Sequence, residues 1–261
     1  MKKQIWLLLL CLPALLILLS ACTKQLDQPL NADEIAGTPN PIQPTYCRIE
    51  SFWENPFAPN QRFILVLYDQ FENPVIVTQP MVTTGHPYRT FKYDTWHRMR
   101  EYRGEYTNGN YEFWHFYGFD LNGRIGVDTM YVLGAIGPTG PATYFERTIS
   151  KMTYDGQGRI IKVVADQQLS PLHTETNYAY DGAGNLMAPG VVYDNKMNLY
   201  RTNDIWQFLH RDYSMNNPFT ATSYNGTNYP TAINSATPML FLNEFQLNHS
   251  QIGYGCRESH W

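Results

Sequence analysis

The sequence predicts an all-β protein whose single domain of antiparallel hairpins forms one long twisted sheet. A turn pattern of an aromatic residue, Asp, two variable residues, Gly, Arg or Asn, and an apolar residue occurs at residues 119–125, 154–160 and 180–186. Aromatic residues make up 15% of the chain and charged residues 16%, whereas charged residues are about a quarter of an average soluble domain. Aromatic-rich strands separated by turn residues at regular spacing are typical of all-β domains.

The residue types of the repeated turn explain its geometry. An Asp at the first position accepts hydrogen bonds from backbone N–H groups two residues on, and a Gly near the end of the loop takes the left-handed conformation that closes it. Two more copies begin at Asp94 and Asp194 but lack the glycine, so they must place a side chain at positive φ or adopt another geometry. The predicted turn residues are therefore Asp94, Asp120, Gly123, Asp155, Gly158, Asp181, Gly184 and Asp194.

These five copies lie within about residues 90–200, and most steps between them are close to multiples of about 13 residues, the length of one strand and one turn. At these residues the chain resembles the YD repeats of RHS-type proteins, whose copies contain Tyr-Asp-x-x-Gly-Arg-Leu and stack as β-hairpins. The resemblance implies strand-turn architecture rather than an activity. A fragment of an RHS delivery system is a weaker hypothesis, because the chain has neither a long repeat array nor a toxin tip.

The N-terminal residues predict export and a lipid anchor. Lys2 and Lys3 precede an almost wholly apolar stretch at residues 5–19, followed by two small residues and Cys22, as in a secretory signal. Residues 19–22, Leu-Ser-Ala-Cys, resemble the bacterial lipobox, which implies cleavage before Cys22 and diacylglyceryl attachment to its sulfur. The alternative is an ordinary signal peptide with an incidental cysteine.

This interpretation divides the chain into three parts and places it in the bacterial envelope. Residues 1–21 form the lipoprotein signal peptide, residues 22–45 a proline-punctuated flexible tether, and residues 46–261 the β domain. We expect the membrane to be a partner through Cys22, with the outer membrane as the location and its periplasmic face and the cell surface both open. The run at residues 211–218 also resembles the C-terminal part of uncharacterised Bacteroidota-type lipoproteins.

Two cysteines remain in the predicted domain once Cys11 leaves with the signal and Cys22 is lipidated. Cys47 and Cys256 lie near its two ends, and an oxidising compartment would allow them to pair. The sequence leaves this pairing open, because it does not show that the two Cα atoms are close.

Other segments predict individual strands and one helix. The continuous apolar run at residues 63–68 predicts a strand covered on both faces, and a closing strand is expected around residues 239–247. Asn203 or Asp204 can cap a short helix near residues 203–210, which is the single helix that we expect in the domain.

Charge and motifs argue against several ligand classes. The chain holds 23 acidic and 19 basic residues, for a net charge of −4, and it has no basic patch, so nucleic acid is not an expected partner. Its seven histidines are scattered without ligand spacing, and the turn aspartates lack the Asp-x-Asx-x-Asx spacing of a calcium loop. The sequence therefore predicts no metal and no cofactor.

The sequence predicts a protein that is not an enzyme and has no catalytic residues. It lacks the G-x-S-x-G and H-E-x-x-H motifs. Residues 210–217 match the kinase spacing H-R-D-x-x-x-x-N, but without the other kinase motifs we interpret them as a polar helix exit in which Arg211 and Asp212 pair. A site assembled from distant residues stays open, and converging carboxylates or a His–Asp pair in one cleft would reveal it.

The functional hypothesis is a non-catalytic structural or interaction module of the cell envelope or surface. The alternative is a glycan-binding accessory lipoprotein that stacks exposed aromatic rings on sugars, with Trp53, Trp96 and Trp114 as candidates. Core packing is the favoured interpretation for Trp206 and also for Trp114. A glycan or an envelope protein is the expected partner, and the oligomeric state is not predicted.

Overall fold

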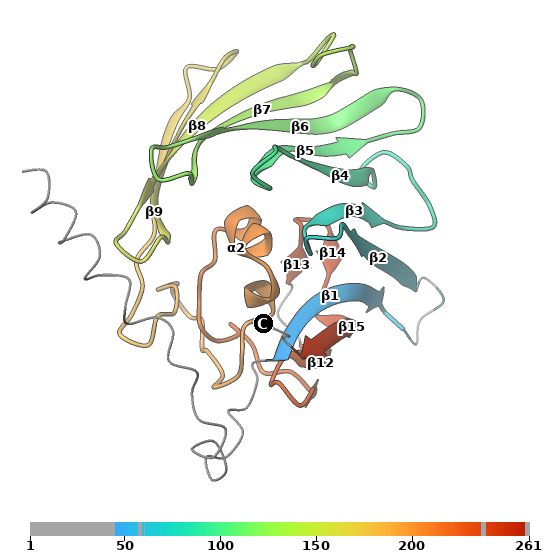
Figure 1. Ribbon diagram of the computed structural model, residues 1–261, viewed down its shortest axis with the longest axis vertical. Helices are drawn as coiled ribbons and strands as arrows, with labels where there is room; N and C mark the ends of the chain where they lie inside the picture. The colour runs from blue at the N-terminus through green and yellow to red at the C-terminus, as the bar shows by residue number, and fades with distance from the viewer. Residues whose placement is uncertain (1–44, 57–58, 60, 236–238, 259–261) are drawn as a thin grey trace, which may run out of the picture. The chain divides into compact units, whose positions relative to one another are not determined.

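A thirteen-stranded antiparallel sheet curves around a short helix in the computed structural model (Figure 1). The structure describes residues 45–56, 59, 61–235 and 239–258, all within the compact unit Pro44–Trp261. Within these ranges no helix has the length and apolar character needed to cross a bilayer. The predicted signal peptide, Cys22 and the predicted tether up to residue 44 lie outside the described residues.

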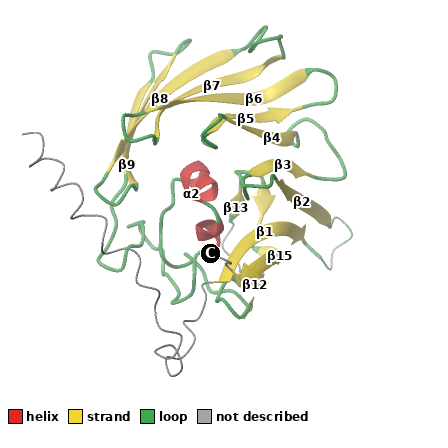
Figure 2. Cartoon of the chain, in the orientation of Figure 1, coloured by secondary structure: helices red, strands yellow, loops and turns green. Residues whose placement is uncertain are grey.

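The strands follow the chain order over most of the sheet. Their bounds are β1 (Thr45–Glu54), β2 (Arg62–Tyr68), β3 (Pro74–Thr78), β4 (Tyr88–Tyr93), β5 (Met99–Glu105), β6 (Asn110–Phe119), β7 (Ile125–Ala135), β8 (Glu146–Tyr154), β9 (Ile160–Gln167), β10 (His173–Asn177), β11 (Ser223–Tyr224), β12 (Pro230–Asn234) and β15 (His249–Glu258). Neighbours pair in the order β10-β9-β8-β7-β6-β5-β4-β3-β2-β1-β15-β12-β11. The prediction of an all-β domain with one long antiparallel sheet is confirmed, as Figure 2 shows.

The closing strand lies later in the chain than predicted. Residues 239–247 form a separate two-stranded hairpin of β13 (Leu240–Phe241) and β14 (Phe245–Gln246). The closing strand is β15, which pairs with β1 on one side and β12 on the other. The apolar side chains of the hairpin cover the inner face of the sheet, where the ring centroids of Phe241 and Phe52 are 4.5 Å apart. The apolar residues at 239–247 therefore pack in the core and do not form a strand of the large sheet, so the prediction was wrong.

Strand β2 is covered on one face only, which corrects the expectation for residues 63–68. Ile64 and Val66 are buried, whereas Phe63, Leu65 and Leu67 are exposed. Successive side chains of a strand point to opposite faces, and the helix and the hairpin lie on the inner face. The outer face of β2 therefore presents a row of apolar side chains.

The predicted helix is present as α2 (Asp204–His210), with Asn203 as its N-cap. The Asn203 side chain accepts a hydrogen bond from the backbone N–H of Ile205 at 2.9 Å. A 3₁₀ helix, η2 (Leu199–Thr202), precedes it and was not expected. Trp206 of α2 is fully buried against the sheet, as predicted, with its ring 5.9 Å from that of Phe91.

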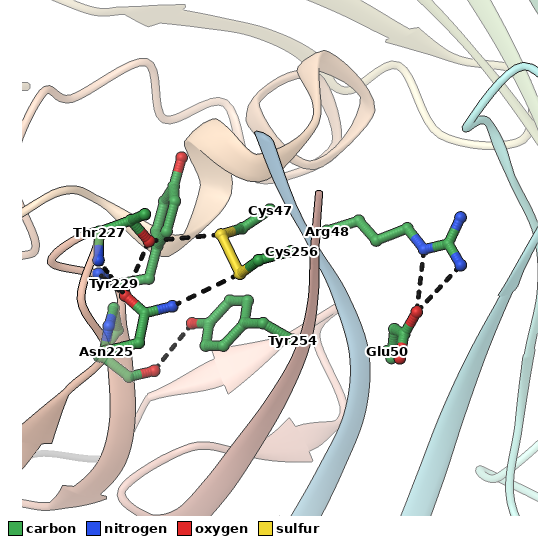
Figure 3. The surroundings of a disulfide bond; sticks show 9 residues. Cys47, Arg48, Glu50, Asn225, Thr227, Tyr229, Tyr254 and Cys256 are labelled. Carbon is green, nitrogen blue, oxygen red and sulfur yellow. Dashed lines mark hydrogen bonds and ion pairs between the residues drawn. A yellow bond between two sulfur atoms is a disulfide. The ribbon is translucent and has the colours of Figure 1, made fainter. Parts of the chain in front are cut away.

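A disulfide between Cys47 and Cys256 joins the first strand to the last (Figure 3). The two residues face each other across the β1–β15 pair, with 4.1 Å between their Cα atoms. Thr227 and Asn225, from the turn between β11 and β12, lie within hydrogen-bonding distance of the two sulfur atoms. The structure thus brings together the two cysteines whose pairing the sequence left open.

Candidate functional site

The repeated turns share one hydrogen-bonding pattern. At Asp155, Oδ1 accepts hydrogen bonds from the backbone N–H groups of Gln157 and Arg159, both at 2.9 Å. Oδ2 accepts from Nε of Arg159 at 2.8 Å, and Gly158 closes the loop at φ +80°. The predicted roles of the turn residues hold at the other copies with the glycine, which are Asp120 with Gly123 and Asp181 with Gly184.

The two copies without glycine differ in how the turn is stabilised. In the Asp94 turn His97 takes the left-handed conformation at φ 60°. At Asp194 the backbone and side-chain N–H groups of Asn217 donate to the carboxylate at 3.1 Å each. In the other turns, the residue four positions after the Asp donates its backbone N–H to the carboxylate. At Asp194 this donor is Asn217, which lies 23 residues later in the chain.

The structure adds two turns that the sequence analysis missed. Asp69 accepts hydrogen bonds from the N–H groups of Phe71 and Asn73, and Asn225 caps the turn between β11 and β12 in the same way. The left-handed positions are held by Glu72 and Asn228. The repeat is therefore wider than the predicted range of about 90–200. An aromatic residue before Asp69 and an Asn four residues after it were the available signal.

Each arginine of a turn stacks on the aromatic residue that begins the next turn. The guanidinium carbon of Arg124 lies 4.5 Å from the ring centroid of Tyr154. Arg98 contacts Phe119 and Arg159 contacts Tyr180 in the same manner, at 3.9 and 4.1 Å.

A second link runs from the tyrosine back to the previous turn. The Tyr154 hydroxyl donates to the carbonyl of Ile125, the residue after Arg124, at 2.7 Å. Desolvation raises the pKa of Tyr154 to about 12, so the hydroxyl keeps its proton at neutral pH. Equivalent bonds run from Tyr93 to Pro74, from Tyr180 to Ile160 and from Tyr193 to Leu186.

These links continue around one end of the sheet until they close. We call the turns that begin at Asp69, Asp94, Asp120, Asp155, Asp181, Asp194 and Asn225, together with the facing residues Cys47 and Cys256 of β1 and β15, the turn ring. The Tyr224 hydroxyl donates to Asp194 at 2.9 Å, the Asn225 turn touches the disulfide, and Glu72 forms ion pairs with Arg48 and Arg257.

A groove of about 650 Å³ lies between the turn ring and the start of the helical segment. Arg98, Arg124 and Gln157 line its ring side, and residues 201–205 with Gln207 and Phe208 line its inner side. A smaller hollow of about 210 Å³ shares Arg201, Gln207 and Gln157 with the groove and also includes Arg159.

Two polar side chains in these hollows, those of Gln207 and Arg201, have no hydrogen-bond or ion-pair partner among the described residues. Gln207 is only 8% exposed, and its side-chain amide makes no hydrogen bond with any residue that the structure describes. Arg201 is exposed and forms no ion pair or ring contact within the same residues. Ligand sites combine a hollow with a few polar groups that can bind the ligand, so the two side chains mark the hollows as a candidate binding site.

The three candidate stacking residues differ in their exposure. Trp96 is 74% exposed on the turn ring, where Arg98, which lines the groove, lies 4.9 Å from its ring. Trp53 is 42% exposed on the outer face. Trp114 is 3% exposed, because Arg103 and the ring of Phe116 cover it. Its assignment to ligand stacking is wrong, and its assignment to packing is correct.

A second groove, of about 410 Å³, lies on the outer face beside Trp53. The ring of Trp53 meets that of Phe63 edge-on at 5.9 Å. Ser223, Thr231 and Gln251 supply polar groups to the same groove.

The structure also holds a His–Asp pair. His115 Nδ1 lies 2.9 Å from Asp128 on the neighbouring strand, but neither residue lines the hollows described above. Arg211 pairs with Asp128 at 3.6 Å rather than with Asp212, whose carboxylate accepts from Ser214. The expected local pairing of Arg211 and Asp212 is therefore wrong.

A further polar cluster fastens the β13–β14 hairpin to the sheet. Glu244, between the two hairpin strands, pairs with Arg62 at 3.2 Å and also with Arg89 and His86. Arg62 and Arg89 are held on β2 and β4, so the cluster bridges the hairpin and the sheet. In the part of the chain that the structure describes, no group of three or more His, Cys, Asp or Glu residues could hold a metal ion.

Comparison with models of known protein families finds no match, and comparison with curated proteins finds none either.

The turn caps predict a specific loss of stability. Replacing Asp155 by Ala removes the acceptor for two backbone N–H groups and the partner of Arg159, so we expect the free energy of unfolding to fall by about 1–2 kcal/mol at neutral pH. Asp166→Ala is the matched control, because Asp166 pairs with His173 and both side chains are about 60% exposed. We expect a loss below about 0.5 kcal/mol there, measured by urea unfolding.

Acid should erase the difference between the wild type and Asp155→Ala. Burial alone would raise the pKa of Asp155, but hydrogen bonds from Arg159 and Gln157 outweigh it and lower the pKa. A carboxyl with a lowered folded-state pKa stabilises the protein above its unfolded pKa, and this contribution is lost as the pH falls through the folded value. The stability gap should therefore be constant above about pH 5 and shrink below about pH 4; a gap that grows in acid would contradict the capping role.

Proposed function

We propose that this protein is an exported bacterial lipoprotein, anchored through Cys22, whose domain is a non-catalytic binding module of the cell envelope. The turn ring is its binding end, and the groove inside the ring holds the ligand. A glycan or an envelope protein is the class of partner that such a surface serves.

The observation that carries the proposal is the side chain of Gln207, which lines two adjoining hollows, belongs to a residue only 8% exposed and has no hydrogen-bond partner among the described residues. Ligand sites are concave and combine apolar walls with a few placed polar groups. The groove has this composition, because Phe119, Tyr154 and Phe208 form its walls beside Arg201 and Gln207. The exposed Trp96 lies outside the lining, with its ring 4.9 Å from Arg98, which is a lining residue.

Export is supported by the disulfide as well as by the N-terminal sequence. Disulfides persist in oxidising compartments and are rare in the cytosol. The Cys47–Cys256 bond therefore agrees with the signal-like residues and the lipobox-like residues before Cys22. A periplasmic or cell-surface location is compatible with both.

Changing Cys22 to Ala tests the anchor. We expect the wild-type protein to fractionate with membranes and to incorporate labelled palmitate, and the Cys22→Ala protein to do neither. Cys11→Ala is the matched control, because Cys11 lies within the predicted signal peptide and should have no effect. Membrane fractionation of a Cys22→Ala protein equal to that of the wild type would contradict the lipid anchor.

A second candidate function is glycan binding at the outer-face groove. The observation that favours it is the exposed ring of Trp53, held edge-on by Phe63 beside the side chains of Ser223, Thr231 and Gln251. An aromatic face next to hydroxyl and amide groups suits a sugar ring and its hydroxyls.

Replacing Trp53 by Ala separates the two candidates. If the outer groove binds neutral glycans, Trp53→Ala should reduce their binding on a glycan array at least about tenfold, whereas Leu67→Ala, which changes an exposed apolar residue of the neighbouring strand β2, should not. Equal binding by the wild type and Trp53→Ala would remove this candidate and leave the turn ring.

A further inference from the structure

The smaller hollow beside the groove is suited to an anion. Its lining consists of Arg159, Arg201, Gln157, Gln207, Tyr213, Met215 and Gly184, which includes two guanidinium groups and two amides but no carboxylate. The larger groove differs, because Asp204 and Glu72 are among its lining residues. Glu72 is paired with Arg48 and Arg257, which leaves the Asp204 carboxylate as an acceptor. We therefore expect the smaller hollow to prefer an anion and the larger groove to prefer a hydrogen-bond donor, such as a hydroxyl, beside Asp204.

The two arginines of the smaller hollow are not equivalent. Arg159 is neutralised by Asp155, at 2.7 Å between Nη2 and Oδ2, and its guanidinium is stacked on Tyr180. Arg201 has no such partner among the described residues. A guanidinium without a carboxylate is a ready partner for a carboxylate or phosphate group, which it can bind with two parallel hydrogen bonds.

The second observation is Gln207, which lines both hollows and is nine-tenths buried without a hydrogen-bond partner among the described residues. An amide offers two donors and one acceptor. It can donate to an anionic group in the smaller hollow and accept from a hydroxyl in the larger one.

We infer that the turn ring binds an acidic saccharide, with its carboxylate or phosphate group on Arg201 and Gln207 in the smaller hollow. The adjoining sugar lies in the groove, where its hydroxyls reach Asp204 and Gln157, and the next sugar reaches the exposed face of Trp96. This inference rests on the proposed function, because it names the ligand class of the same groove.

The composition of the site favours a saccharide over a peptide. The free polar groups are amides and a carboxylate rather than an exposed strand edge, which is what extended peptides use. Trp96 offers an open ring face next to Arg98, and such faces stack on sugar rings. A free anion would need only Arg201 and would not use the larger groove.

Calorimetric titration of the full-length lipoprotein in detergent micelles tests the inference. The probes are oligogalacturonate and its methyl ester, a phosphorylated oligosaccharide and its dephosphorylated form, and inorganic phosphate alone. We expect each charged saccharide to bind at least about tenfold more tightly than its neutral form. Arg201→Gln should remove this preference, and Gln207→Leu should weaken binding of the charged forms.

Lys151→Gln is the control, because it also removes one exposed positive charge and Lys151 does not line either hollow; it should leave the preference unchanged. Thermal unfolding of each variant checks that the fold is kept, and Arg201, being exposed, should not affect it. A wild type that binds charged and neutral forms equally, binds phosphate alone, or binds none of the probes overturns the inference. The anchor is judged separately by the fractionation of Cys22→Ala, so failure here does not decide the proposed function.

Discussion

The capped Asp turn is the interaction on which the rest of the structure depends. One carboxylate, such as that of Asp155, satisfies two backbone N–H groups of its own turn and holds the arginine that ends it. Because the arginine is held in place, its flat face can stack on the aromatic ring that begins the next turn. A local cap thereby sets the spacing between hairpins, and a row of such turns becomes a continuous surface rather than a set of independent loops.

The disulfide takes the place of a turn where the first strand, β1, pairs with the last, β15. Arg48 stacks on Tyr68, and the Tyr68 hydroxyl donates to the carbonyl of Ile49, the residue after Arg48. The same two contacts join Arg124 and Ile125 to Tyr154. Between β15 and β1 there is no turn, and the Cys47–Cys256 bond joins the strands instead. The bond therefore completes the turn ring.

The sequence could predict the strand-turn architecture because its signals are local. The aromatic residue, the Asp and the Gly of each turn lie within one segment of seven residues, and Asn203 caps the helix through the backbone N–H of Ile205. Asp69 was within reach of the same pattern but was missed, because Pro74 stands where the other copies have Ile, Leu or Met. The site itself was not predictable, because Arg201 and Gln207 meet Gln157 and Arg159 only after the sheet curves around the helix. Burial of Trp114 likewise depends on Arg103 from the neighbouring strand.

A double-mutant cycle between Arg124 and Tyr154 tests the central claim, that adjacent turns stabilise each other through this stacking. Urea unfolding of Arg124→Gln, Tyr154→Leu and the double mutant gives the coupling free energy without the separate cost of each change. We expect a favourable coupling of about 0.5–2 kcal/mol, because the guanidinium of Arg124 lies 4.5 Å from the Tyr154 ring. Additive effects, with coupling below about 0.3 kcal/mol, would contradict a turn ring held together by these contacts.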